Sequence, residues 1–484
     1  MDSISKTVHY KQNILLAPDK FIHRETTEDP HQYRSEFQRD RDRIINSQVF
    51  RRLNGKTQVV LPLSNDHVRN RLTHTIEVAQ IAKVVAHQLK LNQILAETIA
   101  LGHDLGHTPF GHVGERTLSH IMNNCADLVE CNNRLSCDAK GFKHNLQSVR
   151  VCCELEKLYP QFRGLNLTNF TLWGIRNHSG LSWINCVYYI KNRCYRRRKP
   201  AECVNKGELA TSFYGIYDNQ CKIPGSDNEA WSFEAFVVKI ADDIAQRHHD
   251  IEDSYITGIL SESEIIDEIS GKYKDAMIES DEKNLNELKA ERKYFLPYVA
   301  KFILNLYTRD LIDTTKEKMK EFAKDAKDEV QNQKDFVRLY PKIKKERYEN
   351  VVSLSKEMKN ADKEFKSFIK DAIHNSYAVQ VMDGKGSFVI DRLFKAYINN
   401  PNQLRDSTIV YIFNILGEEK KHVRELSKKR IGALRNRIIP LLSESDSDKK
   451  FYSALLRAIS DHIAGMTDDY ALGEYSRLYE AKNV

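Results

Sequence analysis

The chain lacks any uninterrupted apolar run of about 18 residues, the length that a membrane-spanning helix requires. Its start, MDSISKTVHYKQN, also lacks the apolar segment of a secretory signal. With 41% hydrophobic and 29% charged residues, the composition is not that of a disordered chain either. We therefore expect a globular protein that is neither exported nor inserted in a membrane, with a cytoplasmic location.

Cysteine is present but lacks the spacing of a zinc site, because none of the nine cysteines forms a C-x-x-C pair. We interpret them as reduced thiols. The formal net charge of +7 suits an anionic ligand. That charge is small for 484 residues and does not by itself indicate nucleic-acid binding.

Hairpin signals are absent too, since no pair of alternating apolar segments flanks an Asn-Gly or Asp-Gly turn. Helical periodicity dominates instead, most clearly in residues 71–89 and 233–253. In the first of these segments we expect a broad apolar face that includes Leu72, Ile76, Ala79 and Val84. The predicted fold class is mainly α-helical.

The chain is long enough for two or three domains. Residues 185–231 form an irregular stretch with the basic run RCYRRRK, and we interpret it as an insertion. Lys and Glu are abundant from 262 to about 375, which predicts long solvated helices, and DGKGS at 383–387 predicts a break. The expected limits are an N-terminal arm (1–39), a core (40–262), a charged helical region (263–380) and a C-terminal helical region (381–484).

The segment LGHDLGHTPFGHVGE (101–115) concentrates three histidines, an aspartate and a glutamate among small and apolar residues. Adjacent His103 and Asp104 project about 100° apart on a helix, so they can bind one ion only if other elements complete its shell. His74 and Asp242 are the candidates, because each is a polar residue among apolar neighbours. Each histidine alone has an alternative role as a hydrogen-bonded core residue, but the set predicts a metal site.

Two imidazoles and two carboxylates with open positions for water suit a single divalent cation. The donor set is compatible with Mn²⁺, Mg²⁺ or Fe²⁺, and also with Zn²⁺, and does not choose among them.

The order H…HD…D resembles the HD-domain phosphohydrolases, and longer blocks resemble the deoxyguanosine triphosphate triphosphohydrolase family. In order along the chain, these blocks are FRRLNGKTQV (50–59), RNRLTHTIEVAQIA (69–82), GHDLGHTPFGHVGE (102–115), GFKHNLQSVR (141–150), GLNLTNFTLWGI (164–175), IADDIAQRHHDIED (240–253) and AGMTDDYAL (464–472). The resemblance implies a helical HD core and a C-terminal region that completes a nucleotide site. It also implies cleavage of a deoxynucleoside triphosphate to deoxynucleoside and inorganic triphosphate.

By position, the resemblance implies that His74, His103, Asp104 and Asp242 bind the metal and that His112 and Glu115 are catalytic. The chemistry agrees, because a histidine three residues before a glutamate can share its helical face and be oriented by it. Either residue could instead cap a helix near Gly111 or Gly114. His107 could likewise serve as a cap, and we expect it either to support a metal ligand or to contact the phosphates. His144 resembles a family residue that faces the phosphates.

A triphosphate also requires cations that do not titrate. Arg71 and Lys239 each lie three residues before a metal ligand, on the same helical face, so both are predicted to bind phosphate. For Arg71 the alternative is a surface ion pair. For Arg51, Arg52 and Lys56 a structural role is an equal alternative.

The sugar contacts implied by the resemblance are Gln58, Gln246 and Asp250. For Asp250, an ion pair with Arg247 or a histidine is the alternative. Relatives commonly read ADDIxY, with a tyrosine that excludes the 2′-hydroxyl, where this chain has Gln246. We therefore expect weaker rejection of ribonucleotides than in those relatives.

Two other classes of function compete with this hypothesis. One is an HD phosphodiesterase that acts on another nucleotide. The other is a regulatory module that binds nucleic acid through RCYRRRK (193–199), with Tyr195 for stacking. The resemblance further implies a homo-oligomer, usually a hexamer or tetramer, with a deoxynucleotide or single-stranded DNA as a possible effector. It leaves a role in nucleotide-pool control and one in depletion of nucleotides during phage infection both open.

Overall fold

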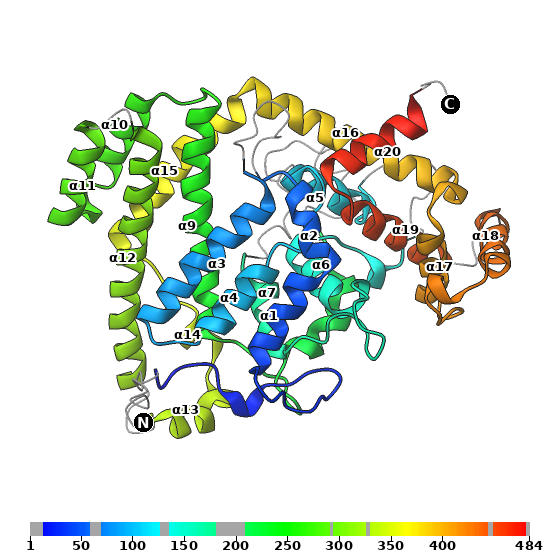
Figure 1. Ribbon diagram of the computed structural model, residues 1–484, viewed down its shortest axis with the longest axis horizontal. Helices are drawn as coiled ribbons and strands as arrows, with labels where there is room; N and C mark the ends of the chain where they lie inside the picture. Colours follow the sequence, from blue (N-terminus) through cyan, green and yellow to red (C-terminus); the bar gives the residue numbers. More distant parts are fainter. Residues whose placement is uncertain are drawn as a thin grey trace, which may run out of the picture.

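The computed structural model describes residues 13–58, 69–125, 135–180, 209–290, 294–325, 330–443 and 449–480. Within these ranges the chain consists of helices joined by turns and loops, with only isolated β-bridges (Figure 1). The prediction of a mainly α-helical fold is confirmed. Residues 185–208 of the predicted insertion, which include the RCYRRRK run, lie outside the described residues.

A bundle at the centre of the molecule carries the predicted site. Helix α3 packs against α4 and α9, and α4 also packs against α1 and α7 (Figure 1). The helices of this part are α1 (Glu36–Asn46), α2 (Gln48–Arg52), α3 (Arg71–Gln88), α4 (Gln93–Gly102), α5 (Gly111–Ile121), α6 (His144–Arg150), α7 (Asn169–Asn177) and α9 (Phe233–Ile256).

The two helices expected from periodicity begin at side-chain caps. Asn70 accepts a hydrogen bond from the backbone N–H of Thr73 at the start of α3, and Ser232 accepts one from Ala235 at the start of α9. Each cap satisfies a backbone donor that the first helical turn leaves unpaired. The caps therefore fix where the two helices that carry His74 and Asp242 begin.

The prediction of which residues form the apolar face of α3 is partly wrong. Ile76 and Val84 are 45% and 50% exposed, whereas the buried face contains His74, Val78 and Ala82. Because α3 has apolar residues on several sides, periodicity alone did not identify the side that packs on α4 and α9. The buried side is the one that carries the polar His74.

The charged region is helical, as its composition predicted, but its helices range from 4 to 31 residues in length. They are α10 (Glu262–Lys272), α11 (Glu279–Ala290), α12 (Phe295–Asp325), α13 (Gln333–Leu339), α14 (Lys345–Tyr348) and α15 (Lys356–Asn375). Helix α12 packs against α9 and buries Val299, Phe302 and Leu306, so one side of it is core. No helix among the described residues combines the length and apolar character needed to cross a membrane.

The C-terminal helices form a second hydrophobic core together with α5. They are α16 (Tyr377–Asn399), α17 (Asp406–Ile415), α18 (Lys428–Ser443), α19 (Lys449–Ala464) and α20 (Asp468–Tyr479). Phe110 and Leu118 at α5 share this core with Ile390 and Phe394 of α16 and Ile459 of α19. The C-terminal region therefore touches the segment that carries His112.

The predicted break at DGKGS is wrong, because α16 runs through residues 383–387 without interruption. A Cβ atom at Gly386 would lie 2.8 Å from the Cβ of Phe110, so the glycine permits close packing of α16 beside α5. Such a glycine costs about 1 kcal/mol of helix propensity relative to alanine. The domain limits proposed from the sequence stay a prediction.

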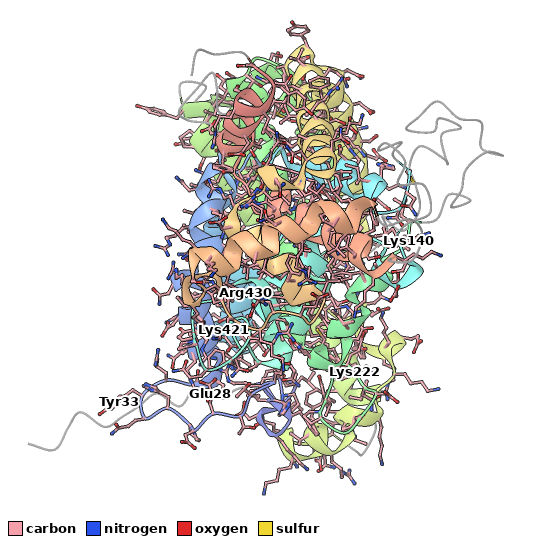
Figure 2. All side chains as sticks on the ribbon, turned by 90° about the vertical axis from the view of Figure 1, so that its right-hand side faces the viewer. Glu28, Tyr33, Lys140, Lys222, Lys421 and Arg430 are labelled. Carbon is pink, nitrogen blue, oxygen red and sulfur yellow. The ribbon has the colours of Figure 1, made fainter. Side chains whose placement is uncertain are left out.

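The described part of the N-terminal arm, residues 13–39, packs on the core. Nη1 of Arg24 donates to Asp40 Oδ1 at 2.6 Å, and Arg43 donates to Glu28 Oε1 at 2.7 Å. Figure 2 labels Glu28 and Tyr33 on the loop at the lower edge of the molecule, where Tyr33 is exposed. Buried ion pairs thus anchor the arm while its outer loop faces solvent.

Candidate functional site

The four predicted metal ligands come together although they belong to three separate elements. His74 lies on α3, His103 and Asp104 follow the last turn of α4, and Asp242 lies on α9. Nε2 of His74 lies 3.0 Å from Asp242 Oδ1, and Nε2 of His103 lies 3.4 Å from Asp104 Oδ1 and 3.7 Å from Asp242 Oδ1. The structure thus makes one cluster from residues up to 168 positions apart.

Both carboxyl groups of the cluster favour the ionised form. Burial raises the pKa of Asp104, but His103, His107 and Arg71 outweigh it and hold that pKa well below its usual range. Burial likewise raises the pKa of Asp242, but the hydrogen bond with His74 and the neighbouring His103 ring lower it overall. The cluster therefore presents two anionic oxygen donors near neutral pH.

His103 provides the test of whether these residues fit a metal ion. Its Nδ1 lies 2.6 Å from the carbonyl oxygen of Ala100, an acceptor that fixes the ring proton on Nδ1. In a neutral ring Nε2 is then unprotonated. It is buried, faces two carboxylates and has no hydrogen-bond partner among the described residues. A cation between these atoms would accept the lone pair of Nε2 and neutralise the repulsion between that nitrogen and the carboxylate oxygens.

His74, His103 and Asp104 also offer ligand atoms that all lie within 4.8 Å of one another. The residues therefore fit a divalent metal. The mixed nitrogen and oxygen donors do not select one metal over another.

Glu115 lies at the centre of the predicted catalytic pair. Its Oε2 is 3.5 Å from Nδ1 of His112, which lies three residues earlier on α5, and 2.9 Å from Nδ1 of His144. Lys143 Nζ lies 3.0 Å from Oε1. Burial raises the pKa of Glu115, but His144, His112 and Lys143 outweigh it and hold that pKa well below its usual range. An ionised Glu115 can therefore orient both imidazoles.

A strained turn sets the position of His112. Phe110 and Gly111 both have left-handed backbone angles, with φ of 59° and 57°. The backbone N–H of Phe110 donates to Asp468 Oδ1, and that of Thr57 donates to Asp468 Oδ2, each at 2.8 Å. Asp468, from the AGMTDDYAL block, thereby ties the turn to the segment that carries Gln58. His112 itself has a half-exposed side chain.

The rings of His107 and His144 stack on each other with centroids 4.0 Å apart. Nε2 of His107 lies 3.3 Å from Asp104 Oδ1. Burial and the charge of Arg71 lower the pKa of His107 well below its usual range, so the ring is neutral near pH 7.

Sequence reasoning missed His178. Its Nε2 lies 3.4 Å from Nε2 of His144, and its ring centroid lies 5.0 Å from that of His103. Burial lowers the pKa of His178 to about 3. A single histidine in RNHSG, after an apolar helix, has no spacing that would have distinguished it.

The structure distinguishes the basic residues that the sequence had grouped together. Arg71 is buried, and its Nη1 donates to Asp104 Oδ2 at 2.6 Å, so a surface ion pair is excluded. Its Nε and Nη2 atoms have no hydrogen-bond partner among the described residues. Lys239 is half-buried, one turn before Asp242.

The other basic candidates have structural contacts or lie outside the core. Lys56 donates to the carbonyl oxygens of Ala464 and His107, and Arg52 donates to that of Gly465 at 2.9 Å. Burial lowers the pKa of Lys56 to about 7. These two residues tie the C-terminal region to the core, whereas Arg51 is exposed.

The predicted sugar contacts are less tightly defined. Gln58 is half-buried, and its Oε1 has no hydrogen-bond partner among the described residues. Gln246 and Asp250 are half-buried on α9, one and two turns after Asp242. Asp250 Oδ2 lies 3.5 Å from Nη1 of Arg247, so the alternative ion pair is present. Burial raises the pKa of Asp250 to about 6.

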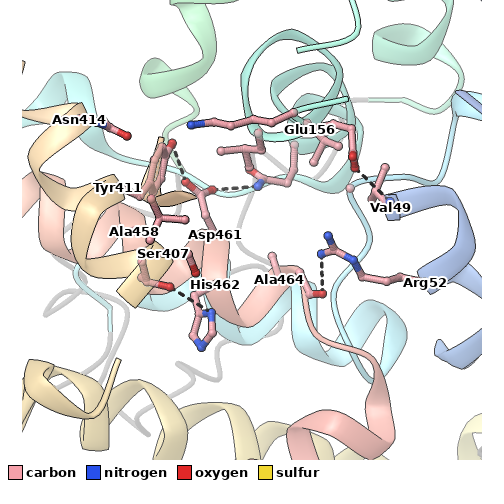
Figure 3. Close-up of a pocket in the computed structure, with 18 of the residues that line it drawn as sticks. Val49, Arg52, Glu156, Ser407, Tyr411, Asn414, Ala458, Asp461, His462 and Ala464 are labelled. Carbon is pink, nitrogen blue, oxygen red and sulfur yellow. Dashed lines mark hydrogen bonds between the residues drawn. The ribbon is translucent and has the colours of Figure 1, made fainter. Parts of the chain in front are cut away.

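A cavity of about 230 Å³ lies next to this site without containing it (Figure 3). Leu105 and Gly106, which follow Asp104, contribute to its wall, together with Tyr411 of α17 and Asp461 of α19. Apart from Arg52, for which the sequence left a structural role as an equal alternative, no residue predicted to bind metal or nucleotide lines this cavity. Asp461 also accepts a hydrogen bond from Gln147 at 2.8 Å, so part of the polar wall is already bonded. The cluster of predicted metal ligands, His74, His103, Asp104 and Asp242, therefore defines the site better than the cavity does.

Comparison with known proteins agrees with this geometry. A family model described as "HD domain" matches residues 71–247, and one described as "Phosphohydrolase-associated domain" matches residues 352–413 and 418–477.

Among individual relatives, a deoxyguanosinetriphosphate triphosphohydrolase-like protein of Rickettsia akari (strain Hartford) is 32% identical, over 93% of this chain and 91% of its own. Proteins with the same description from Rickettsia prowazekii (strain Madrid E) and Bordetella pertussis (strain Tohama I) are 33% and 30% identical. The matches cover 93% and 96% of this chain, and 93% and 94% of the two relatives.

The helical fold and the His and Asp cluster define a phosphohydrolase of the HD-domain class. Within that class, the chain belongs to the deoxyguanosinetriphosphate triphosphohydrolase-like family.

Proposed function

We propose that the protein hydrolyses deoxynucleoside triphosphates, dGTP or several of them, to deoxynucleoside and inorganic triphosphate. The observation that carries this proposal is the proximity of two groups of residues. The His74, His103, Asp104 and Asp242 cluster lies beside the His107, His144 and Glu115 group, joined to it by the 3.3 Å contact between His107 and Asp104. The names of the relatives support the same substrate class.

The four-residue cluster would hold one divalent ion, with Mn²⁺, Mg²⁺ or Fe²⁺ as the first candidates. When bound, the ion would supply Lewis-acid polarisation of the phosphoryl oxygen and a water of lowered pKa. Arg71 would bind the phosphates with the guanidinium nitrogens that its bond to Asp104 leaves available. Lys239 would add a second positive charge on the side of α9.

His112 would transfer the proton of the reaction. Its side chain is half-exposed and therefore accessible to a bound nucleotide, while its Nδ1 is oriented by the buried carboxylate of Glu115. Glu115 would keep its negative charge and stabilise whichever imidazole becomes protonated. His107 and His144 would line the phosphate path as stacked imidazoles.

Gln58, Gln246 and Asp250 would contact the deoxyribose. Oε1 of Gln58 is buried and has no hydrogen-bond partner within the described ranges, so it is suited to accept a hydrogen bond from a ligand. Asp250 would accept one from the 3′-hydroxyl, and Gln246 would lie near the 2′ position with less bulk than a tyrosine. A preference for deoxynucleotides would then depend on several contacts.

On the resemblance alone, we extend the proposal to a homo-oligomer, a hexamer or tetramer, that is regulated by a deoxynucleotide or single-stranded DNA. The role would be control of the nucleotide pool or depletion of nucleotides during phage infection. Light scattering with and without each effector would test the assembly.

The decisive experiment incubates the protein with each deoxynucleoside triphosphate, singly and mixed, and separates the products by chromatography. We expect intact triphosphate and deoxynucleoside, with the activity abolished by a chelator and restored by Mn²⁺. Pyrophosphate and monophosphate as the main products would contradict the proposal. A salt-dependent DNA shift without nucleotide turnover would favour a binding module instead.

A further inference from the structure

A chain of hydrogen bonds leads from the cluster of predicted metal ligands into the interface between α3 and α9. Nδ1 of His74 lies 3.1 Å from Nδ1 of His249, and Nε2 of His249 is bonded to Oε2 of Glu77. His249 is fully buried on α9, and Glu77 lies on α3, one turn after His74. The two helices lie side by side along this contact (Figure 1).

The two ring nitrogens of His74 face opposite partners. Nε2 lies 3.0 Å from Asp242, on the side of the metal cluster, and Nδ1 faces His249. A histidine that binds a metal through Nε2 must carry its proton on Nδ1. His74 then donates to His249, and His249 can accept only at an unprotonated Nδ1.

The position of the proton on His249 follows from the same reasoning. With Nδ1 unprotonated, a neutral ring has its proton on Nε2, and Nε2 donates to the carboxylate of Glu77. Every donor and acceptor in the chain from His74 to Glu77 is then paired. A neutral imidazole at each position leaves only this arrangement compatible with a metal at Nε2 of His74.

We propose that His249 and Glu77 are positioning residues for the metal ligand His74. They fix its tautomer and the rotation of its ring, and the charge of Glu77 increases the basicity of its Nε2 through His249. The inference rests on the proposed metal site, and neither residue was among the candidates taken from the sequence.

A second metal centre is the competing interpretation, because Glu77, His248 and His249 offer ligand atoms that all lie within 4.8 Å of one another. Arg69 opposes it, because its Nε donates to Glu77 Oε1 at 3.2 Å and its Nη1 is bonded to Glu252. A guanidinium already neutralises the carboxylate that a second cation would need.

The pair of glutamates that bind Arg69 provides a matched control. Glu77 and Glu252 each form an ion pair with Arg69, but only Glu77 is bonded to His249. We would titrate the chelator-treated protein with Mn²⁺ by calorimetry and compare wild type with Glu77→Ala and Glu252→Ala. We expect Mn²⁺ affinity to fall about 10- to 100-fold in Glu77→Ala. In Glu252→Ala it should stay within about twofold of wild type.

Variants of His249 separate the hydrogen bond from simple packing. His249→Leu should weaken Mn²⁺ binding at least as much as Glu77→Ala, whereas His249→Asn, whose Oδ1 can accept from His74, should restore part of the affinity. Thermal unfolding of the metal-free proteins identifies any variant that fails to fold. Because Glu77 is partly exposed, its variant tests the proposal even if His249→Leu does not fold.

Equal Mn²⁺ affinity in Glu77→Ala and Glu252→Ala would overturn the positioning role. Two equivalents of Mn²⁺ in wild type, with one lost in Glu77→Ala, would also overturn it and support a second metal centre. A wild-type protein that binds no Mn²⁺ would remove the basis of the proposed function itself, which is a distinct result.

Discussion

Asp242 and Asp250 lie two turns apart on helix α9, yet their surroundings shift the pKa values of the two carboxyl groups in opposite directions. Both carboxyl groups lose solvent. At Asp242 the bond with His74 and the His103 ring outweigh burial and lower the pKa, whereas at Asp250 burial outweighs Arg247 and raises it to about 6. The partners on neighbouring helices, and not position on α9, decide which carboxylate is ready to bind a cation.

The first prediction concerns loss of the Asp242 carboxylate, for which we expect the largest effect. Asp242→Ala should weaken Mn²⁺ binding by at least about 100-fold, because loss of a direct ligand costs more than loss of a residue that only orients one. Turnover of dGTP should disappear with the metal. Asp250→Ala is the matched control and should retain the metal, as measured by calorimetry. Loss of metal in both variants would show that the two carboxylates are not functionally distinct.

A second prediction separates metal binding from proton transfer. His112→Ala should lower kcat by about 10²- to 10⁴-fold, the usual contribution of a positioned acid or base. Its Mn²⁺ affinity should match that of wild type, because His112 contacts Glu115 and none of the four ligands. If metal and activity are lost together in His112→Ala, the proposed division of roles is wrong.

The third prediction concerns the raised pKa of Asp250, and it replaces this carboxyl group with an amide, which does not ionise. With a folded pKa near 6 and an ordinary value of 3.8, ionised Asp250 destabilises the folded protein above pH 6. The penalty shrinks as the pH falls from 6 toward 4, since the group is then protonated in the folded state. Asp250→Asn should therefore raise the free energy of unfolding by about 1 to 3 kcal/mol at pH 8 and by almost nothing at pH 4.

Asp253 is the control for that experiment. Burial raises its pKa to about 7, and neither of its oxygens has a hydrogen-bond partner among the described residues. Asp253→Asn should stabilise the protein in the same pH range but leave KM for dGTP unchanged, whereas Asp250→Asn should raise KM. If Asp250→Asn destabilises the protein at pH 8, the ion pair with Arg247 is the main role of Asp250.

The smallest expected effect concerns Gln246, which lies between the two aspartates. Gln246→Tyr should increase the preference for dGTP over GTP, measured as the ratio of kcat/KM, by about 10-fold, because a ring excludes a 2′-hydroxyl by shape. Unchanged discrimination would mean that Gln246 does not line the sugar pocket.

The helical class and the two segments that carry His74 and Asp242 could be predicted from the sequence, because periodicity and capping are local. The set of polar residues in apolar surroundings also led to a group that the structure brings together. The orientation of α3 could not be derived in this way, and Ile76 and Val84 were assigned to the wrong side. Packing against α4 and α9 decides that orientation, and periodicity contains no information on it.

His178 and His249 were missed for a related reason. Each contacts the site through another histidine, His144 in one case and His74 in the other. Such contacts join elements that are distant in the sequence, and neither residue has a spacing that marks it. The continuous α16 was missed because Gly386 looks like a break in the sequence, whereas its role is to let Phe110 approach.

The bonds from Phe110 and Thr57 to Asp468 have a consequence for biosynthesis. Their sequence separations are 358 and 411 residues, so the ribosome makes the acceptor long after both donors. At about 5 to 20 residues per second, Asp468 follows Phe110 by on the order of 20 to 70 seconds. A nascent chain in that interval can already contain the metal cluster, while the turn that carries His112 still lacks its anchor. Completion of the candidate site therefore waits until nearly all of the described chain has been made.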